Sequence, residues 1–307
     1  MSGYTGSRVV DFIEDPWKYY FKGFLGDGSD GAIDLDGTND YSFVTKIGSL
    51  YILNRSVYLT SLEIRNNVTL FTNNYMIFNL GVTTGYGVNA LITCSGASGA
   101  NASGETGGAG GTGTVAGDLG AQASGGTGAD ADTGKDGDPE LGEAGQSVTA
   151  SQSGANGGAG GVATGAGSQP GGTATYRGRR IVTDQFLAGV NLLSGGAGGS
   201  GGSSDDIANA AGGGGGAGGG IVFLASYEIQ GTLSITSNGG NGGTAVNGGG
   251  GGGGGGGAVV CYYQSISNNV TFSASGGSGG NSTNDGDGVD GEDGIIMRYN
   301  FSNYTWE

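Results

Sequence analysis

Two stretches of this chain, Ile221–Gly243 (IVFLASYEIQGTLSITSNGGNGG) and Ala258–Gly280 (AVVCYYQSISNNVTFSASGGSGG), repeat one pattern thirty-seven positions apart, each after a run of glycine. Aligned without a gap, they match apolar with apolar and glycine with glycine: Ile229 with Ile266, Leu233 with Val270, Ile235 with Phe272, and Gly239–Gly243 with Gly276–Gly280. Repetition at a fixed period predicts that each unit buries its apolar face on its neighbour and that the units stack. Each copy is expected to form two short strands and a glycine tail, a pattern typical of structural proteins.

Glycine accounts for 76 of the 307 residues, far above an average usage of about 7%. Such a composition without a period is typical of disorder. Here the glycines recur every third residue, at Gly104, Gly107, Gly110 and Gly113, at Gly154, Gly157 and Gly160, and at Gly195, Gly198 and Gly201. Three residues per turn is the polyproline II pitch, and the small number of prolines, 3, argues against a collagen triple helix. The spacing therefore predicts polyglycine II helices, whose bare backbones pack by sideways hydrogen bonds.

Short strands are predicted ahead of the glycine runs, because apolar residues alternate in Leu62 and Ile64, Val68 and Leu70, and Tyr75 and Ile77. Asn66-Asn67 and Asn73-Asn74 supply the turns between them. The predicted fold class is all-β, a short-strand β-solenoid or sandwich with polyglycine II-like helices packed between β segments. Helix content should be very low.

The composition divides the chain into an aromatic docking segment (1–25), a β region (26–95), a glycine-rich insertion (96–175) and a repeat β/glycine-rich region (176–307). The last of these is expected to include a β segment at Ile181–Leu193 and a closing strand at Ile295–Tyr299. Aromatic side chains crowd the first segment, and they either dock on a partner or cap the first strand of the fold: Phe12, Trp17, Tyr19, Tyr20, Phe21 and Phe24.

The formal net charge of −16 argues against nucleic acid and against anionic membranes as partners. No signal peptide and no membrane-spanning stretch are expected from the sequence. The chain has no histidine, which removes the commonest general base, the usual serine triad and most transition-metal sites. The sequence therefore predicts that the protein is not an enzyme.

Acidic residues gather in glycine-rich turns, where carboxylate and carbonyl oxygens suit calcium. We expect no other cofactor, and solvated acidic turns are the alternative reading. The candidate calcium ligands are Asp285, Asp287, Asp290 and Asp293, and two similar groups are Asp27, Asp30, Asp34 and Asp36, and Asp130, Asp132, Asp136 and Asp138. Arg177, Arg179 and Arg180 are predicted to pair with acidic loops or a neighbouring subunit, and binding of an anionic ligand is the alternative. Cys94 and Cys261 are predicted to be buried thiols.

The sequence resembles glycine-rich structural proteins of tailed bacteriophage virions in three features. These are the Gly-Asp-Gly-Ser-Asp-Gly turn at 26–31, the paired strands through Val68–Tyr75, and the glycine runs that feed strands at Ile221 and Ala258. The glycine-rich part is similar to the polyglycine-sandwich adhesins at the tips of long tail fibres of T-even-like phages. That resemblance implies receptor contact through loops at the ends of glycine helices. This chain differs in its substantial β segments before and between the glycine runs.

From this resemblance we expect a virion surface protein, a tail fibre or adhesin component that contacts the host surface. The alternative is a capsid decoration or other purely architectural virion protein. Either would assemble in the host cytoplasm beside other virion proteins, and by analogy as a homotrimer.

Overall fold

The computed structural model describes residues 23–114, 117–131, 140–147, 155–163, 167, 169–174, 196–204 and 210–307. It is nearly all β, with 35% strand and 1% helix, which confirms the predicted class. The strands are β1 (Gly31–Leu35), β2 (Val44–Ile47), β3 (Leu50–Leu53), β4 (Val57–Arg65), β5 (Thr69–Phe71), β6 (Met76–Thr93), β7 (Ile221–Thr236), β8 (Ala258–Ile266), β9 (Val270–Ser273), β10 (Ile295–Asn300) and β11 (Thr305–Trp306).

These strands form one mixed sheet in the order β11-β10-β8-β7-β6-β5-β3-β2, which β1 joins through β4 and β9 through β7. Neighbours are parallel except for β2 with β3 and β10 with β11 among the described strands. The register confirms the alignment of the two repeats, since Ile229 pairs with Ile266 and Leu233 with Val270. β10 continues the same period, because its Ile295 pairs with Ala258 of β8. The closing strand is therefore the start of a third copy.

The long strands β6 and β7 each serve two layers of the β part, which we call the β body. Their first halves pair with β4 and β8, and their second halves pair with β5 and β9. One apolar cluster joins the layers, with Leu62 and Cys261 from the first and Leu70 and Ile235 from the second. Burying each Leu or Ile side chain contributes about 1.5–3 kcal/mol. The β body is thus held by an ordinary side-chain core.

Asparagine forms the corners where the chain leaves one layer for the other. Asn67, Asn73 and Asn74 have φ of 62°, 51° and 61°, a left-handed region that asparagine tolerates better than most residues. This confirms the turns predicted at both Asn-Asn pairs. Asn74 is fully buried, and its Oδ1 accepts the backbone N–H of Ile221 at 2.7 Å, so this corner also fixes the start of β7.

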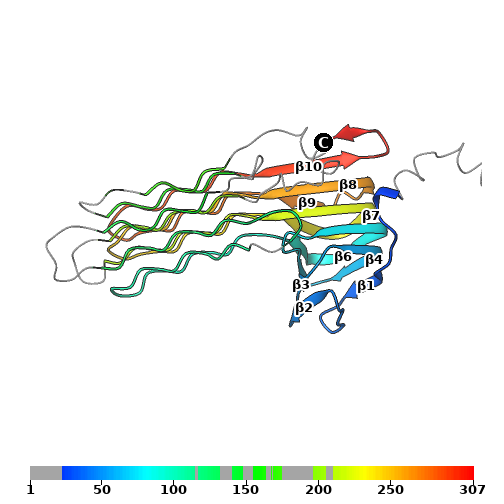
Figure 1. Ribbon diagram of the computed structural model, residues 1–307, viewed down its shortest axis with the longest axis horizontal. Coiled ribbons are helices and arrows are strands. Elements are labelled where there is room, and N and C mark those ends of the chain that lie inside the picture. The colour runs from blue at the N-terminus through cyan, green and yellow to red at the C-terminus, as the bar shows by residue number, and fades with distance from the viewer. Residues whose placement is uncertain are drawn as a thin grey trace, which may run out of the picture.

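Beyond the β body, extended glycine-rich segments run side by side and lengthen the molecule in one direction (Figure 1). We call this part the glycine lattice. Several segments are direct continuations of strands, because 210–220 leads into β7, 237–245 leaves it and 248–257 leads into β8. The described segments are 95–103, 106–114, 121–131, 140–147, 155–163, 169–174, 196–204, 210–220, 237–245, 248–257, 274–282 and 285–294.

Backbone hydrogen bonds of the lattice follow a period of three. In the buried segment 210–220, successive N–H groups turn to different neighbours and return to the first after three residues. The N–H groups of Gly213, Gly214, Gly215 and Gly216 reach the carbonyls of Gly249, Ala100, Gly126 and Gly252 at 2.8–3.0 Å. Segments 196–204 and 248–257 are equally buried and bond in the same way. Each inner segment is therefore enclosed on all sides by other backbones.

Glycine is required at most inner positions because no space is left for a side chain. A Cβ on Gly252 would overlap the carbonyl oxygen of Gly158, and one on Gly216 would overlap that of Gly240. Gly167, at the edge, would meet only a methyl group of Leu141 at 3.7 Å. The close approach of bare backbones replaces side-chain packing in this half of the molecule.

Candidate functional site

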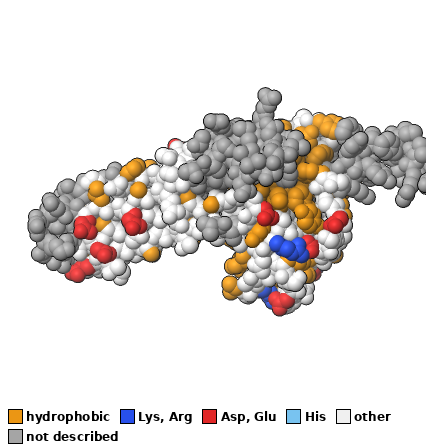
Figure 2. All heavy atoms as spheres, viewed as in Figure 1, with side chains coloured by type: hydrophobic (Ala, Val, Ile, Leu, Met, Phe, Trp, Pro, Cys, Tyr) orange, Lys and Arg blue, Asp and Glu red, His pale blue; other side chains and the backbone are white. Residues whose placement is uncertain are grey.

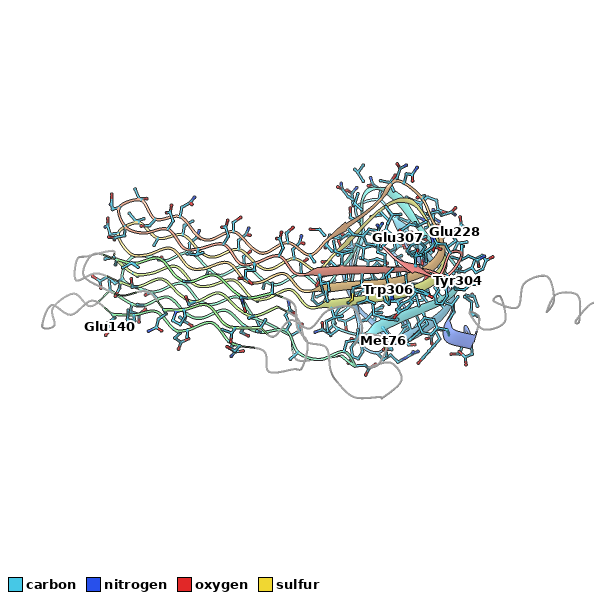
Figure 3. All side chains as sticks on the ribbon, turned by 90° about the horizontal axis from the view of Figure 1, so that it is seen from above. Met76, Glu140, Glu228, Tyr304, Trp306 and Glu307 are labelled. Carbon is cyan, nitrogen blue, oxygen red and sulfur yellow. The ribbon has the colours of Figure 1, made fainter. Side chains whose placement is uncertain are left out.

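The lattice ends, far from the strands, in turns that we call the distal turns, residues 101–107, 244–248 and 281–287. Glu140, the first described residue of segment 140–147, lies at this same end in Figure 3, opposite Tyr304, Trp306 and Glu307 of the β body. The lattice therefore separates two ends of an elongated molecule, and each end is a candidate contact surface.

Two of the distal turns are copies of each other and stack in register. Ala245 and Ser282 form a parallel bridge, and Asn284 Nδ2 donates to Asn247 Oδ1 at 2.5 Å. Ser282 Oγ donates to the carbonyl of Gly248 at 2.7 Å. Val246 is 56% exposed at the apex of its turn. These bonds fix the turns, so the exposed apolar side chain stands on a defined backbone.

Carboxylates gather toward this end of the lattice on the face that Figure 2 draws, where their side chains are red. Asp130 Oδ1 accepts the N–H of Gly107 at 2.7 Å, and Glu143 Oε2 accepts that of Thr127 at 3.2 Å. Glu105 and Glu140 lie in the same part of the lattice. An acidic surface of this kind suits hydrogen-bond donors and cations and repels anions.

The four aspartates predicted to hold calcium lie along the outer segment 285–294. Asp287, Asp290 and Asp293 accept three separate backbone N–H groups, those of Ser282, Gly279 and Gly276, at 2.7–2.9 Å. Asp285 lies at the turn, where its N–H donates to Ser282 Oγ at 3.1 Å. Among the described residues no three carboxylates, cysteines or histidines gather as a metal site. Calcium binding therefore stays a prediction without a gathered ligand set.

The amino-terminal acidic group is also spread over separate partners. Arg55 donates to both oxygens of Asp30 at 2.6 and 2.9 Å, and this bond holds the pKa of Asp30 below its usual value. Arg65 pairs with Asp34 at 2.8 Å. The carboxylate of Asp36 accepts bonds from the N–H of Asn39 and from Thr38, which lowers its pKa to about 2. These carboxylates hold turns and strands of the β body. Of the third group only Asp130 is described.

An aromatic cluster covers the outer side of the first layer of the β body. Phe24, the one described member of the predicted docking set, lies 5.0 Å from the ring of Tyr262 and 6.0 Å from that of Phe301. Tyr299 and Trp306 continue the cluster at 5.1 Å. Phe24 thus packs on aromatic rings of its own fold. Phe12, Trp17, Tyr19, Tyr20 and Phe21 lie outside the described residues, as do Arg177, Arg179 and Arg180.

The structure confirms that Cys94 and Cys261 are buried free thiols. Burial raises the pKa of both, so neither is a reactive thiolate at neutral pH. Cys261 belongs to the core between the layers, and Cys94 Sγ donates to Asn74 Oδ1 at 3.3 Å. Both thiols serve packing.

Side-chain caps along the rims of the lattice are the functional feature that sequence reasoning missed. Asn238, Asn241 and Asn101 use Oδ1 to accept the backbone N–H of Ser275, Ser278 and Thr244 at 2.9–3.0 Å. The aspartates of segment 285–294 likewise accept backbone N–H groups of the adjacent segment 274–282. A polar residue at every third position of a glycine segment is the signal that marks such a rim, and Asp287, Asp290 and Asp293 show it in the sequence.

Comparisons with protein-family models, with curated proteins and with solved structures found no match to this chain. In the part of the chain that the structure describes, no helix has the length and apolar character needed to cross a membrane.

Proposed function

We propose that the glycine lattice consists of polyglycine II helices and that the β body is a short β-solenoid whose coils carry these helices as excursions. In the lattice, backbone N–H groups three residues apart bond to the same neighbouring segment. This supports polyglycine II helices, since polyproline II geometry has three residues per turn. Parallel pairing at a thirty-seven-residue period supports the β-solenoid, as in β7 with β8 and β8 with β10.

We further propose that the protein is a virion surface adhesin of a tail fibre, which contacts the host through its distal turns. The observation that carries this proposal is the separation of two ends by a lattice whose inner segments are nearly free of side chains and are hydrogen-bonded to the surrounding backbones. Such a lattice holds the distal turns away from the β body without a mobile linker. The acidic turns and the exposed Val246 then form the contact surface, and the β body faces the particle.

The remaining parts of the proposal follow the same assignment. The protein has no catalytic role, its partners are other virion proteins and a host surface molecule, and it assembles in the host cytoplasm as a homotrimer. The oligomer rests on the resemblance to tail-fibre proteins alone.

Cell binding by the purified chain tests the adhesin role. We expect the labelled protein to bind cells of the strain that its source particle infects and to compete with the particle for adsorption. Val246→Glu at the distal end should abolish both effects. Ile47→Glu, at a 63% exposed position on β2, is the matched control and should leave them unchanged.

The opposite outcome supports the architectural alternative. If the protein labels capsids, does not bind cells and does not compete with adsorption, it is a decoration protein and the adhesin assignment is wrong.

A further inference from the structure

Two long stretches of this strongly acidic chain carry no charged residue, and the carboxylates of Asp287, Asp290 and Asp293 border the second of them. Between Ile229 and Asn284 the sequence has no Asp, Glu, Lys or Arg, and the same holds from Val88 to Gly104. These stretches supply adjacent strands and adjacent lattice segments, since Thr93 pairs with Thr236 and Gly99 donates to Asn241. Their outward side chains form one surface, which we call the neutral face.

The neutral face carries hydroxyl and carboxamide groups in rows that run across neighbouring segments. From the β body to the distal end the rows are Ser234 and Thr271, then Thr93, Thr236 and Ser273, then Ser95, Asn238 and Ser275, then Ser98, Asn241 and Ser278, then Asn101, Thr244 and Asn281. Thr93 is buried, and the other members are partly or fully exposed. Strands lie about 4.8 Å apart, and lattice positions three residues apart are separated by about 9.3 Å at 3.1 Å per residue. The polar groups therefore repeat in two directions.

Hydrogen bonds within the rows hold these hydroxyl and carboxamide groups in place, and some N–H donors remain for a ligand. Ser234 Oγ lies 3.0 Å from Thr271 Oγ1, and Thr236 Oγ1 lies 2.8 Å from Thr93 Oγ1. The Oδ1 atoms of Asn101 and Asn241 are occupied by backbone N–H groups at 2.9 and 3.0 Å. Both residues are exposed, and each keeps its Nδ2 group as a donor for a ligand. Groups held in this way lose little entropy when a ligand binds.

Charge decides which ligand this face suits. An anionic polymer would be repelled by a chain of net charge −16, and a cationic one would be drawn to the carboxylates of the distal turns and of segment 285–294. A ligand that is uncharged, rich in hydroxyl and ether oxygens and repetitive matches an uncharged, repetitive array of donors and acceptors.

We propose that the neutral face binds an uncharged polysaccharide laid along the lattice. This is a second contact surface, additional to the distal turns, and it rests on the adhesin role only for its biological setting. The polysaccharide lies against the side of the lattice, beside the distal turns.

Isosteric amide-to-acid exchange gives a sharp test. In the double variant N101D/N241D the side-chain oxygen still caps the backbone N–H of Thr244 and Ser278, while the Nδ2 donor is replaced by a charged oxygen. The control is D287N/D290N, which makes the reverse exchange at capping positions of the outer segment. The full chain and both variants are applied to a glycan array of neutral and acidic oligosaccharides and to dextran and mannan gels, after circular dichroism shows matching thermal unfolding.

We expect the wild type and D287N/D290N to bind neutral glycans and N101D/N241D to lose at least about tenfold in affinity, a difference of about 1.4 kcal/mol. Three results would overturn the proposal: no binding to any neutral glycan, equal binding by N101D/N241D, or a loss of self-association in N101D/N241D measured by sedimentation, which would mean that the face joins copies of the chain. Failure of cell competition together with retained glycan binding would overturn the adhesin role alone.

Discussion

The β body and the glycine lattice solve the same packing problem with opposite means. In the β body, apolar side chains such as Leu62, Leu70 and Ile235 meet between two layers of strands. In the lattice, bare backbones meet directly, and inner segments such as 210–220 direct their N–H groups to several surrounding segments. The first arrangement depends on large side chains and the second on their absence. Their sensitivity to substitution should therefore be opposite.

The comparison also explains how the two halves join without a break. Parallel strands and lattice segments are both held by backbone hydrogen bonds to neighbouring segments. A strand can therefore continue into the lattice where glycine and other small residues replace its larger side chains. β7 does this at both ends, between segments 210–220 and 237–245. What changes at the boundary is how often a backbone N–H returns to the same neighbouring segment. It does so every two residues in a strand and every three residues in the lattice.

Enlarging an inner glycine should have the largest effect. In Gly252→Val the new Cβ would overlap the carbonyl oxygen of Gly158, and backbone cannot yield as a side chain can. We expect a loss of more than about 3 kcal/mol in the free energy of unfolding, or no folded protein. Thermal unfolding followed by circular dichroism measures it. Gly167→Val at the exposed edge is the control, and an equal loss there would contradict the lattice account.

Shrinking a side chain of the β body should come next. Leu62→Ala removes a fully buried side chain between the two layers and should cost about 2–5 kcal/mol. The exposed Ile47→Ala should change stability by less than about 0.5 kcal/mol. Urea unfolding of both variants gives the comparison, and similar values would mean that the layers do not form a core.

The Asp30–Arg55 pair should make the β body sensitive to acid. Because Arg55 lowers the folded pKa of Asp30 below 3.8, the stabilisation is present above that value and is lost as the pH falls through the folded pKa. We expect Asp30→Asn to cost about 1 kcal/mol at neutral pH and the difference from wild type to vanish in strong acid. Urea unfolding at several pH values measures it, with the exposed Asp40→Asn as the control.

Removing a rim cap should have the smallest effect. Asp290→Ala leaves the exposed N–H of Gly279 to water and should cost about 0.5–1 kcal/mol. Asp290→Asn keeps an acceptor oxygen and should restore most of the loss. Hydrogen exchange at Gly279 reports the cap directly. Unchanged exchange in Asp290→Ala would show that the carboxylate does not protect this rim.

Much of the β body could be predicted from local patterns. Alternating residues such as Leu62 and Ile64 marked β4, and the Asn-Asn pairs marked the corners, because asparagine tolerates positive φ. The alignment of the repeats gave the register of β7 with β8, since apolar positions must face the same core. At Ile295 the sequence predicts only a closing strand and not a third copy, because the residues there diverge from the repeat.

The candidate site was less accessible to sequence reasoning. The acidic groups suggested calcium because carboxylates near in sequence are often near in space. In the structure Asp287, Asp290 and Asp293 instead lie three residues apart along one segment, and each meets a different backbone N–H.

The sequence by itself determined the strand periodicity, the corners and the requirement for glycine, because each depends on residue type and on neighbours along the chain. Only the tertiary structure decided which segments surround which, which glycines are inner, and that Asn101 and Asn241 lie on one face. Those relations join residues far apart in the chain through backbone hydrogen bonds. Every non-proline residue has the same backbone N–H and C=O groups, so the residue types do not indicate which segments these bonds connect.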